Sequence, residues 1–539
     1  MTVRYVRGRI FTADPENPWA TTLVVGKDGR LAHVGDGDSP PQPGDEVVDL
    51  AGAVVLPGII DAHTHLIYLG RSLTEVALVD ARDLADIQSR VRAAGQKNPN
   101  AARICGNGWL YTALGGRAPI RELLDEVLPD RPVYLSANDQ HSAWLNTAAL
   151  AELGIDDETP DPVDGTIERD QSGHATGLLI EGAMQTLMRR SLETSMTEAD
   201  HEAAMAAALD AYTAAGVTGV VDMGLDETSL SALERLLAKD ALPIRVSGHW
   251  LVHRTGDERA DLAQVDIARQ HALRIDHPRL RVLGIKVKTD GVIDSCTAAM
   301  KAPFADGRHP APIWDRASLT PVIEAAHRAD LQIAIHAIGD EASDVALDVL
   351  EGLEQAGGGA GACRRDRLEH LETVTPENVE RIARLGVIAS IQPVHSDPAI
   401  QENWRERLGD ERVSRGYPWA ELVSAGATIT LGSDAPTAPY QPLPNLYIAA
   451  TRRSAMNPGL EANLAENSFP LEAAIAHATA DAAYSCWSES VTGRLAPGMS
   501  ADFIVLDADP FRDGPIALRD ATVECTVVEG VRLAMKCPS

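Results

Sequence analysis

The stretch Val54-Val55-Leu56-Pro57-Gly58-Ile59-Ile60-Asp61-Ala62-His63-Thr64-His65 decides the fold of this chain. Its apolar first half predicts a buried β-strand that ends in irregular chain after Leu66. Because side chains alternate between the two faces of a strand, His63 and His65 are expected to point the same way. Two imidazoles at the end of one strand are half of a metal site, and ligands further along the chain would supply the rest.

Seven more β-type runs follow this stretch and are separated by segments with helical periodicity, such as residues 197–214 and 319–330. Strands that alternate with helices are typical of a parallel sheet. Eight such strands predict an α/β fold, a closed (β/α)₈ TIM barrel. The seven further runs are residues 216–222, 244–249, 280–288, 331–336, 367–370, 386–391 and 427–434.

The two ends of the chain predict a second, discontinuous domain. Short alternating runs within residues 1–55 and 488–539 indicate β-strands from both ends, which would pair into one small β-sandwich. Residues 56–487 would form the barrel. The segment at about 67–196 is too long for one βα connection, so we expect an insertion with its own helices, placed as a lid over the C-terminal face of the barrel.

Composition excludes several classes of partner. The 539 residues carry a formal net charge of -30, which argues against a nucleic-acid or anionic-membrane partner. The charge says little about a small-molecule substrate. The six cysteines show no Cys-x-x-Cys spacing, which indicates reduced thiols rather than a disulfide framework or a zinc ribbon. The N-terminal residues lack the apolar run of a secretory signal. A cytoplasmic location is therefore expected.

Residues of metal-ligand type recur at the C-terminal ends of the predicted strands. A barrel brings these strand ends onto one rim, where the active sites of such enzymes lie. One histidine at a strand end would be an ordinary core residue, but agreement across several strands favours a metal centre. The residues are His63, His65, Lys286, His336, His370 and Asp434.

With these ligands the chain resembles the amidohydrolase superfamily, in particular its branch of YtcJ-like proteins and N-substituted formamide deformylases (amidohydrolase family 3). The resemblance covers nearly the whole chain. Its motifs lie at residues 8–12, 56–65, 141–146, 177–181, 286–291, 432–436 and 495–503.

The resemblance implies two divalent metal ions, with zinc the expected metal. One ion would be bound by His63, His65 and Asp434, and the other by His336 and His370. A carbamate formed from CO₂ on Lys286 would bridge them, since it supplies two oxygen ligands that an ammonium group cannot.

Lys288 is the alternative bridging residue. It lies two positions beyond Lys286 and so faces the same way on a strand, with Asp290 continuing the row. The family's lysine lies four residues before an Asp-Gly pair, which selects Lys286.

The implied reaction is hydrolysis of a non-peptide amide C–N bond, as in an N-substituted formamide, by a metal-bridging hydroxide. Asp434 would accept the proton and pass it to the leaving nitrogen. The candidate substrate-binding residues are His141, His249, His395 and Asp290.

Several alternatives stay open. The same binuclear site suits hydrolysis of a cyclic amide, a carbamate or a lactone, because specificity lies in the loops. A deaminase is disfavoured, since mononuclear members of the superfamily do not need Lys286. A non-catalytic scaffold is also disfavoured, because all six ligands are present. A homodimer is an expectation from the family alone.

Overall fold

The computed structural model describes residues 2–37, 44–99, 101–138, 141–162, 165–275, 277–357, 364–401 and 403–533. Eight parallel strands form one sheet in the order β21-β20-β19-β18-β17-β16-β15-β8. They are β8 (Ile59–Thr64), β15 (Val217–Leu225), β16 (Arg245–Val252), β17 (Leu280–Lys288), β18 (Gln332–Ala337), β19 (Arg367–His370), β20 (Ile388–Ile391) and β21 (Ile429–Leu431). The predicted (β/α)₈ barrel is confirmed.

The barrel closes between its first and last strands, at the level of the predicted ligands. The backbone N–H of Asp434 donates to the carbonyl of His63 at 2.7 Å, and the N–H of His65 donates to the carbonyl of Ala435 at 2.9 Å. Gly432 permits this approach, because a Cβ added there would lie 2.6 Å from the backbone nitrogen of His63. The closure thus sets two histidines against Asp434.

Helices return the chain between successive strands, as right-handed parallel connections require. Several begin at a side-chain cap; Asp226, for example, accepts the backbone N–H of Ser229 at the start of α7. The main helices are α6 (Glu198–Ala214), α7 (Glu227–Ala238), α8 (Glu258–Arg274), α9 (Arg316–Arg328), α10 (Asp340–Gln355), α12 (Pro376–Leu385), α15 (Trp419–Ala425) and α16 (Pro442–Thr451). Shorter ones are α13 (Trp404–Leu408), α14 (Asp410–Val413), α17 (Leu471–His477), α18 (Ala480–Ser485), α19 (Pro510–Asp513) and α20 (Ile516–Asp520).

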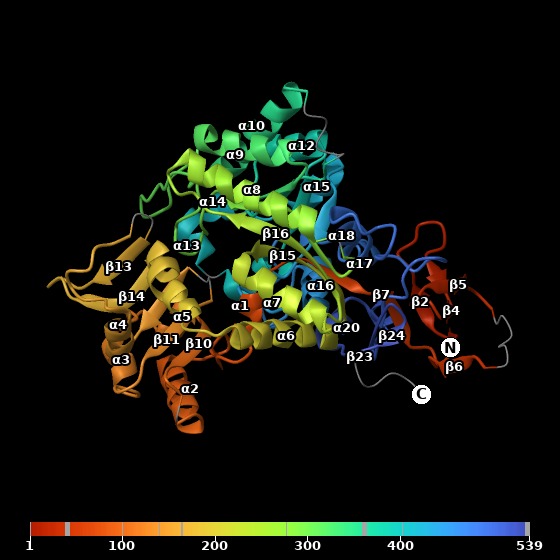
Figure 1. The fold of residues 1–539 in the computed structure, drawn as a ribbon, viewed down its shortest axis with the longest axis horizontal. Coiled ribbons are helices and arrows are strands. Elements are labelled where there is room, and N and C mark those ends of the chain that lie inside the picture. Colours follow the sequence, from red (N-terminus) through yellow and green to blue (C-terminus); the bar gives the residue numbers. More distant parts are fainter. Residues whose placement is uncertain are drawn as a thin grey trace. The chain divides into compact units, whose positions relative to one another are not determined.

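Strands from both chain ends form two further sheets, which confirms the predicted β-sandwich (Figure 1). One has the order β5-β4-β1-β6 and the other β24-β23-β22-β7-β2-β3. They share a core that includes Leu23, Val55, Phe503 and Val527. The strands are β1 (Val3–Val6), β2 (Arg9–Phe11), β3 (Trp19–Ala20), β4 (Thr22–Val25), β5 (Leu31–Gly35), β6 (Glu46–Asp49), β7 (Val54–Pro57), β22 (Phe503–Leu506), β23 (Val523–Val528) and β24 (Val531–Arg532).

The run at residues 54–60 was predicted to form one strand, and the structure divides it between two sheets. β7 pairs with β22 in the sandwich, whereas β8 pairs with β15 in the barrel. Gly58 separates them at a point where an added Cβ would lie 2.3 Å from the Thr218 hydroxyl oxygen. An apolar run cannot reveal such a change of sheet, because both halves are buried.

The insertion belongs to a second compact unit, residues 67–208 with 436–438. We expected helices, but a six-stranded mixed sheet is present as well, in the order β13-β14-β12-β11-β10-β9. Its core includes Leu135, Trp144 and Leu178. The strands are β9 (Val76–Ala77), β10 (Ile104–Trp109), β11 (Val133–Ala137), β12 (Ser142–Leu145), β13 (Gly165–Arg169) and β14 (Ala175–Glu181). The helices are α1 (Leu66–Ser72), α2 (Leu84–Lys97), α3 (Arg121–Asp125), α4 (Thr147–Leu153) and α5 (Arg190–Thr194).

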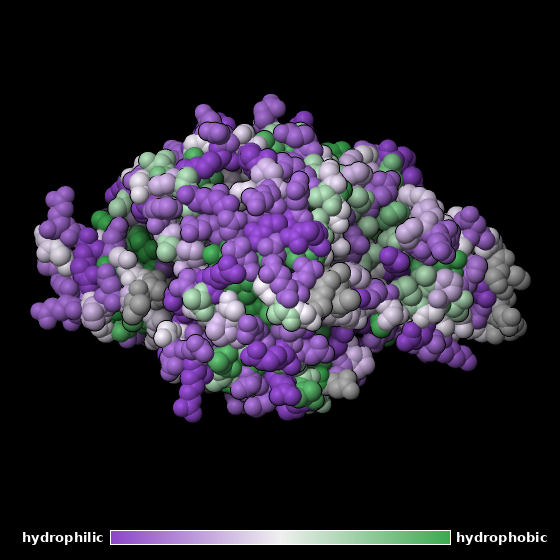
Figure 2. Space-filling model, turned by 90° about the horizontal axis from the view of Figure 1, so that it is seen from above, coloured by the Kyte–Doolittle hydropathy of each residue, from purple (hydrophilic) through white to green (hydrophobic). Residues whose placement is uncertain are grey.

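The expectation of reduced thiols is wrong for Cys525 in β23, which is disulfide-bonded. Spacing along the sequence does not reveal which sulfur atoms meet in space. Cys105, Cys296 and Cys486 are free thiols. Hydrophilic residues cover most of the face seen in Figure 2, as a strongly acidic chain requires. None of the described helices has the length and apolar character needed to cross a membrane.

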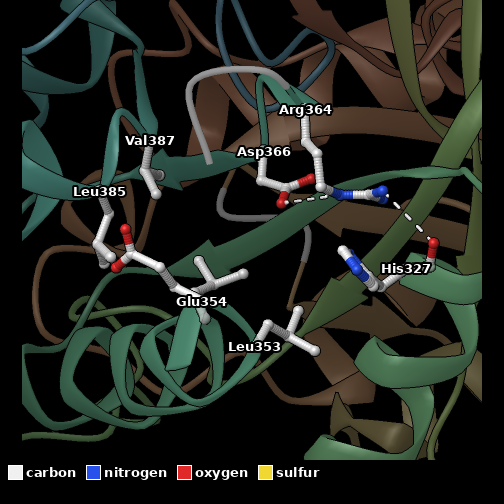
Figure 3. Close-up of a pocket in the computed structure, with 8 residues that line it drawn as sticks. His327, Leu353, Glu354, Arg364, Asp366, Leu385 and Val387 are labelled. Atoms are coloured by element: carbon white, nitrogen blue, oxygen red, sulfur yellow. Dashed lines mark hydrogen bonds and ion pairs between the residues drawn. The ribbon is translucent and has the colours of Figure 1, made fainter. Parts of the chain in front are cut away.

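A small cavity lies beside the N-terminal end of β19, at the opposite end of that strand from His370 (Figure 3). The Asp366 carboxylate lies 3.6 Å from the Arg364 guanidinium and accepts the backbone N–H of Ile333 at 3.0 Å. Burial nevertheless raises the pKa of Asp366 from 3.8 to about 6. The cavity is lined by His327, Leu350, Leu353, Glu354, Arg364, Asp366, Leu385 and Val387.

This pKa shift predicts that Asp366→Asn stabilises the folded protein more at high pH than at low pH. The folded protein binds the proton more tightly than the unfolded chain, so this group's contribution to stability is full below pH 3.8 and is lost as pH rises through about 6. The free energy of unfolding lost in this way is on the order of 3 kcal/mol. Asp366→Asn should therefore raise the Tm by a few degrees at pH 8 and much less at pH 5, in thermal unfolding of both proteins. An equal shift at the two pH values would contradict the assignment.

Candidate metal centre

Asp434 lies at the centre of a group of imidazoles on the C-terminal rim of the barrel. Its Oδ1 is 3.3 Å from His63 Nε2 and 3.1 Å from His65 Nε2. Its Oδ2 is 3.6 Å from His395 Nε2 and 4.0 Å from His370 Nδ1. Four imidazoles from three strand ends therefore converge on one carboxylate.

The protonation states in this group are those that metal binding requires. Burial alone would raise the pKa of Asp434, but His63 and His65 outweigh it and hold the pKa well below its usual range. Burial, reinforced by the neighbouring His336, lowers the pKa of His370 well below its ordinary value. The site thus offers an ionised carboxylate and a neutral imidazole, the forms that bind a divalent cation.

Two of these residues have strained backbones. His370 has φ 79° and Asp434 has φ 59°, in the left-handed region that non-glycine residues rarely adopt. Such a conformation persists only where the surrounding structure enforces it, and it is concentrated at functional sites. Here it turns each ligand side chain at the end of its strand.

Asp61 fixes the first and last strands beneath the site. One carboxylate oxygen accepts the backbone N–H groups of Ser433 at 2.9 Å and His63 at 3.1 Å. The other accepts the hydroxyls of Ser433 at 2.5 Å and Tyr212 at 2.9 Å. This buried network holds His63 and Asp434 in register.

Lys286 lies in β17, facing Asp434 and Glu369 in the barrel interior. Burial lowers the pKa of Lys286 to about 8, although the charges of Glu369 and Asp434 oppose the shift. The neutral amine that reacts with CO₂ is therefore accessible near neutral pH. Lys288 is only half-buried and pairs in register with His336.

His336 is oriented by its Nε2, which donates to the carbonyl of Gly291 at 3.2 Å. The nitrogen that donates must carry the ring proton, so Nδ1 holds the lone pair. The His336 and His370 rings lie in edge-to-face contact, with centroids 4.3 Å apart. Nδ1 is thus the nitrogen of His336 suited to binding a cation.

His395 joins the group from the 3₁₀ turn η3 (Pro393–Ser396) after β20. Its Nδ1 lies 3.1 Å from a carboxylate oxygen of Glu372, while its Nε2 faces Asp434. Burial would lower the pKa of His395, but Glu372 and Asp434 raise it above its ordinary value. His395 therefore lies beside Asp434, and its predicted contact with substrate stays a prediction.

Two other predicted substrate contacts lie deeper in the first unit. His249 is fully buried within β16, bonded to Gln332, and pairs with Gly284, two residues before Lys286. Burial lowers its pKa to about 3. Asp290 accepts the backbone N–H groups of Ala299, Ile338 and Gly339 at 2.7–3.1 Å. These contacts favour a core role for His249 and a loop-anchoring role for Asp290.

His141 lies in the second unit. Its Nδ1 is 2.7 Å from a carboxylate oxygen of Glu181, whose backbone has φ 51°. The part of this unit that carries His141 is thus held by an ion pair and a strained turn. The predicted contact of His141 with substrate stays a prediction.

The donor set fits a divalent cation. His63 Nε2 and His370 Nδ1 are buried and have no hydrogen-bond partner within the described part of the chain. Buried polar atoms normally have a hydrogen-bond partner, so these two nitrogens are candidates for binding a cation. Two groups of described residues have ligand atoms within 4.8 Å of one another: His63, His370 and Asp434, and His370, Glu372 and His395.

Sequence reasoning missed three charged residues next to the ligands. Arg367 and Glu369 lie two residues apart on β19, and both are fully buried. Glu372 lies two residues after His370. The spacing of Arg367 and Glu369 is a usable signal, because residues two apart on a strand share a face. Nothing in the sequence indicates which histidine each acid would meet.

Known proteins resemble the chain along most of its length. The amidohydrolase family (Amidohydro_3) matches residues 46–534. Protein LONG AFTER FAR-RED 3 of Arabidopsis thaliana is 32% identical over 98% of this chain and 90% of its own. Putative amidohydrolase YtcJ of Bacillus subtilis is 30% identical, with 90% of each chain covered. N-substituted formamide deformylase of Arthrobacter pascens is 27% identical over 98% of this chain and 97% of its own.

A solved structure agrees with these matches. An uncharacterized metal-dependent hydrolase from Pyrococcus horikoshii superimposes with a TM-score of 0.76 at 27% identity, covering 95% of this chain and 98% of its own. Together with the donor set on the rim, these matches identify a hydrolase that uses a divalent metal. The chain belongs to the amidohydrolase family.

Proposed function

We propose that this hydrolase cleaves a non-peptide amide C–N bond, in an N-substituted formamide or a similar small amide. The observation that carries the proposal is the placement of Asp434, whose two oxygens face separate imidazoles on either side. Such a carboxylate can bind a cation through one oxygen and exchange a proton through the other. The full-length likeness to N-substituted formamide deformylase supports the choice of substrate class.

The residues would divide between two cations. His63, His65 and Asp434 would bind one, His336 and His370 the other, and a carbamate on Lys286 would bind both. When bound, zinc or a similar ion supplies hydroxide at neutral pH and polarises a carbonyl oxygen. The low pKa of His370 and the shifted pKa of Lys286 prepare both side chains for these roles.

Asp434 carries the proton during the reaction. The oxygen of water adds to the amide carbon, and Asp434 takes the proton that this water loses. When the C–N bond breaks, Asp434 returns the proton to the nitrogen, so that an N-substituted formamide gives formate and an amine. His395, which contacts Glu372 and lies beside Asp434 Oδ2, would contact the substrate at this step.

The test combines metal content with a substrate panel. Protein expressed with zinc and bicarbonate should contain about two metal ions per chain by elemental analysis. It should release formate from N-substituted formamides, measured against a panel of cyclic amides, carbamates and lactones. Chelator-treated protein is the control and should regain activity when zinc is returned.

Two other outcomes would change the proposed substrate class or the proposed metal centre. Turnover of a cyclic amide, carbamate or lactone in place of the formamides would overturn the substrate class while keeping the metal site. About one metal ion per chain would overturn the binuclear centre and would favour a mononuclear hydrolase or a deaminase.

A further inference from the structure

A fully buried ion pair lies directly behind His63. The Arg367 guanidinium donates to one oxygen of Glu369 at 2.7 Å and to the other at 3.3 Å. That second oxygen lies 2.6 Å from His63 Nδ1. Both members of the pair have 0% exposed surface. The Arg367 nitrogen that lies 3.3 Å from Glu369 also donates to the carbonyl of Ala62 at 2.8 Å. The pair thus ties β19 to the strand that carries His63.

Burial of two charges needs an explanation, because their desolvation commonly cancels the attraction between them. Apolar side chains of similar volume would fill the same space at less cost. Apolar residues could not accept a hydrogen bond from His63 Nδ1, as Glu369 does. Arg367 donates to both carboxylate oxygens of Glu369, and one of these oxygens faces His63 Nδ1 at 2.6 Å.

That hydrogen bond fixes the tautomer of His63. With the ring proton on Nδ1, the lone pair lies on Nε2, which points towards Asp434 Oδ1 at 3.3 Å. This is the same nitrogen that is buried without a hydrogen-bond partner among the described residues. A carboxylate behind an imidazole also increases the basicity of the opposite nitrogen.

We propose that Glu369, held in place by Arg367, is a positioning residue that keeps His63 in its metal-binding tautomer and raises the affinity of the site for a divalent cation. The inference rests on the metal centre of the proposed function. The affinity of the site for a divalent cation would then depend on Arg367 and Glu369, a charge pair that touches neither the cation nor the substrate.

The test is zinc affinity, measured by competition with a chelator on metal-stripped protein. Glu369→Gln should weaken zinc binding by about 10- to 100-fold, since an amide is a weaker partner for the imidazole. It also leaves Arg367 buried without its counter-ion, which lowers the Tm of the stripped protein. Asp366→Asn, a buried acid at the other end of β19, is the control and should bind zinc as the wild type does.

The double variant Arg367→Met/Glu369→Gln separates positioning from folding. It removes both charges, so the Tm of the stripped protein should recover towards that of the wild type, while zinc binding stays weak. Recovery of zinc affinity along with the Tm would overturn the inference, as would wild-type affinity in Glu369→Gln. Failure of both variants to fold would mark the pair as structural and overturn it too. If the wild type itself binds no zinc, the proposed metal centre fails instead.

Discussion

Asp434→Asn is expected to lower kcat by about 10²- to 10⁴-fold, the usual range for loss of a positioned acid–base group. Asparagine keeps an oxygen that can face His63 and His65, which lie 3.3 and 3.1 Å from Oδ1 in the wild type. It cannot accept and return a proton at neutral pH. Metal content by elemental analysis should therefore stay close to that of the wild type, while kcat on the best substrate of the panel falls.

The matched control is Asp366→Asn, the same change in another buried carboxylate of the same barrel. Asp366 lies at the N-terminal end of β19 and is bonded to the backbone of Ile333. Its replacement should leave kcat unchanged. Near-normal turnover in Asp434→Asn would remove Asp434 from the role of base, and loss of metal there would show that its charge is needed for binding.

The barrel was predictable because most of its parallel strands are rich in apolar residues, as strands covered on both faces by helices and core commonly are. The run predicted at 280–288 is β17, Leu280–Lys288, and the one at 367–370 is β19, Arg367–His370. The candidate ligands could be predicted for a related reason: His63, Lys286 and Asp434 interrupt or end such runs with groups that water would otherwise solvate. Because the C-terminal ends of barrel strands lie on one rim, residues that are far apart in the sequence meet there.

Contacts between distant elements were not predictable in this way. The change of sheet at Gly58 depends on Thr218 lying against it, 160 residues further along the chain. The insertion's sheet consists of short strands that pair out of sequence order, with β12 between β11 and β14. The bond between His63 and Glu369 spans 306 residues, so a histidine motif alone cannot show which acid will orient it.

Lys286→Ala should remove most of the bound metal, from about two ions per chain to at most about one. The structure favours Lys286 over its neighbour on three grounds. It is buried whereas Lys288 is half-buried, it is influenced by the charges of Glu369 and Asp434, and its pKa is lowered to about 8. A carbamate there would supply two anionic oxygens, so its removal would deprive both proposed cations of a shared ligand. Elemental analysis of protein grown with zinc and bicarbonate measures the loss.

Lys288→Ala is the control that this chain provides, because it removes an amine from the same strand and face two residues away. It should keep the metal content of the wild type. Lys286→Glu should recover part of it, since a glutamate brings a carboxylate without needing CO₂. If instead Lys288→Ala loses metal and Lys286→Ala keeps it, the bridge belongs to Lys288, which is in register with His336. Metal retained in both variants would mean that no lysine bridges the site, and His63, His65 and Asp434 would then form a mononuclear centre.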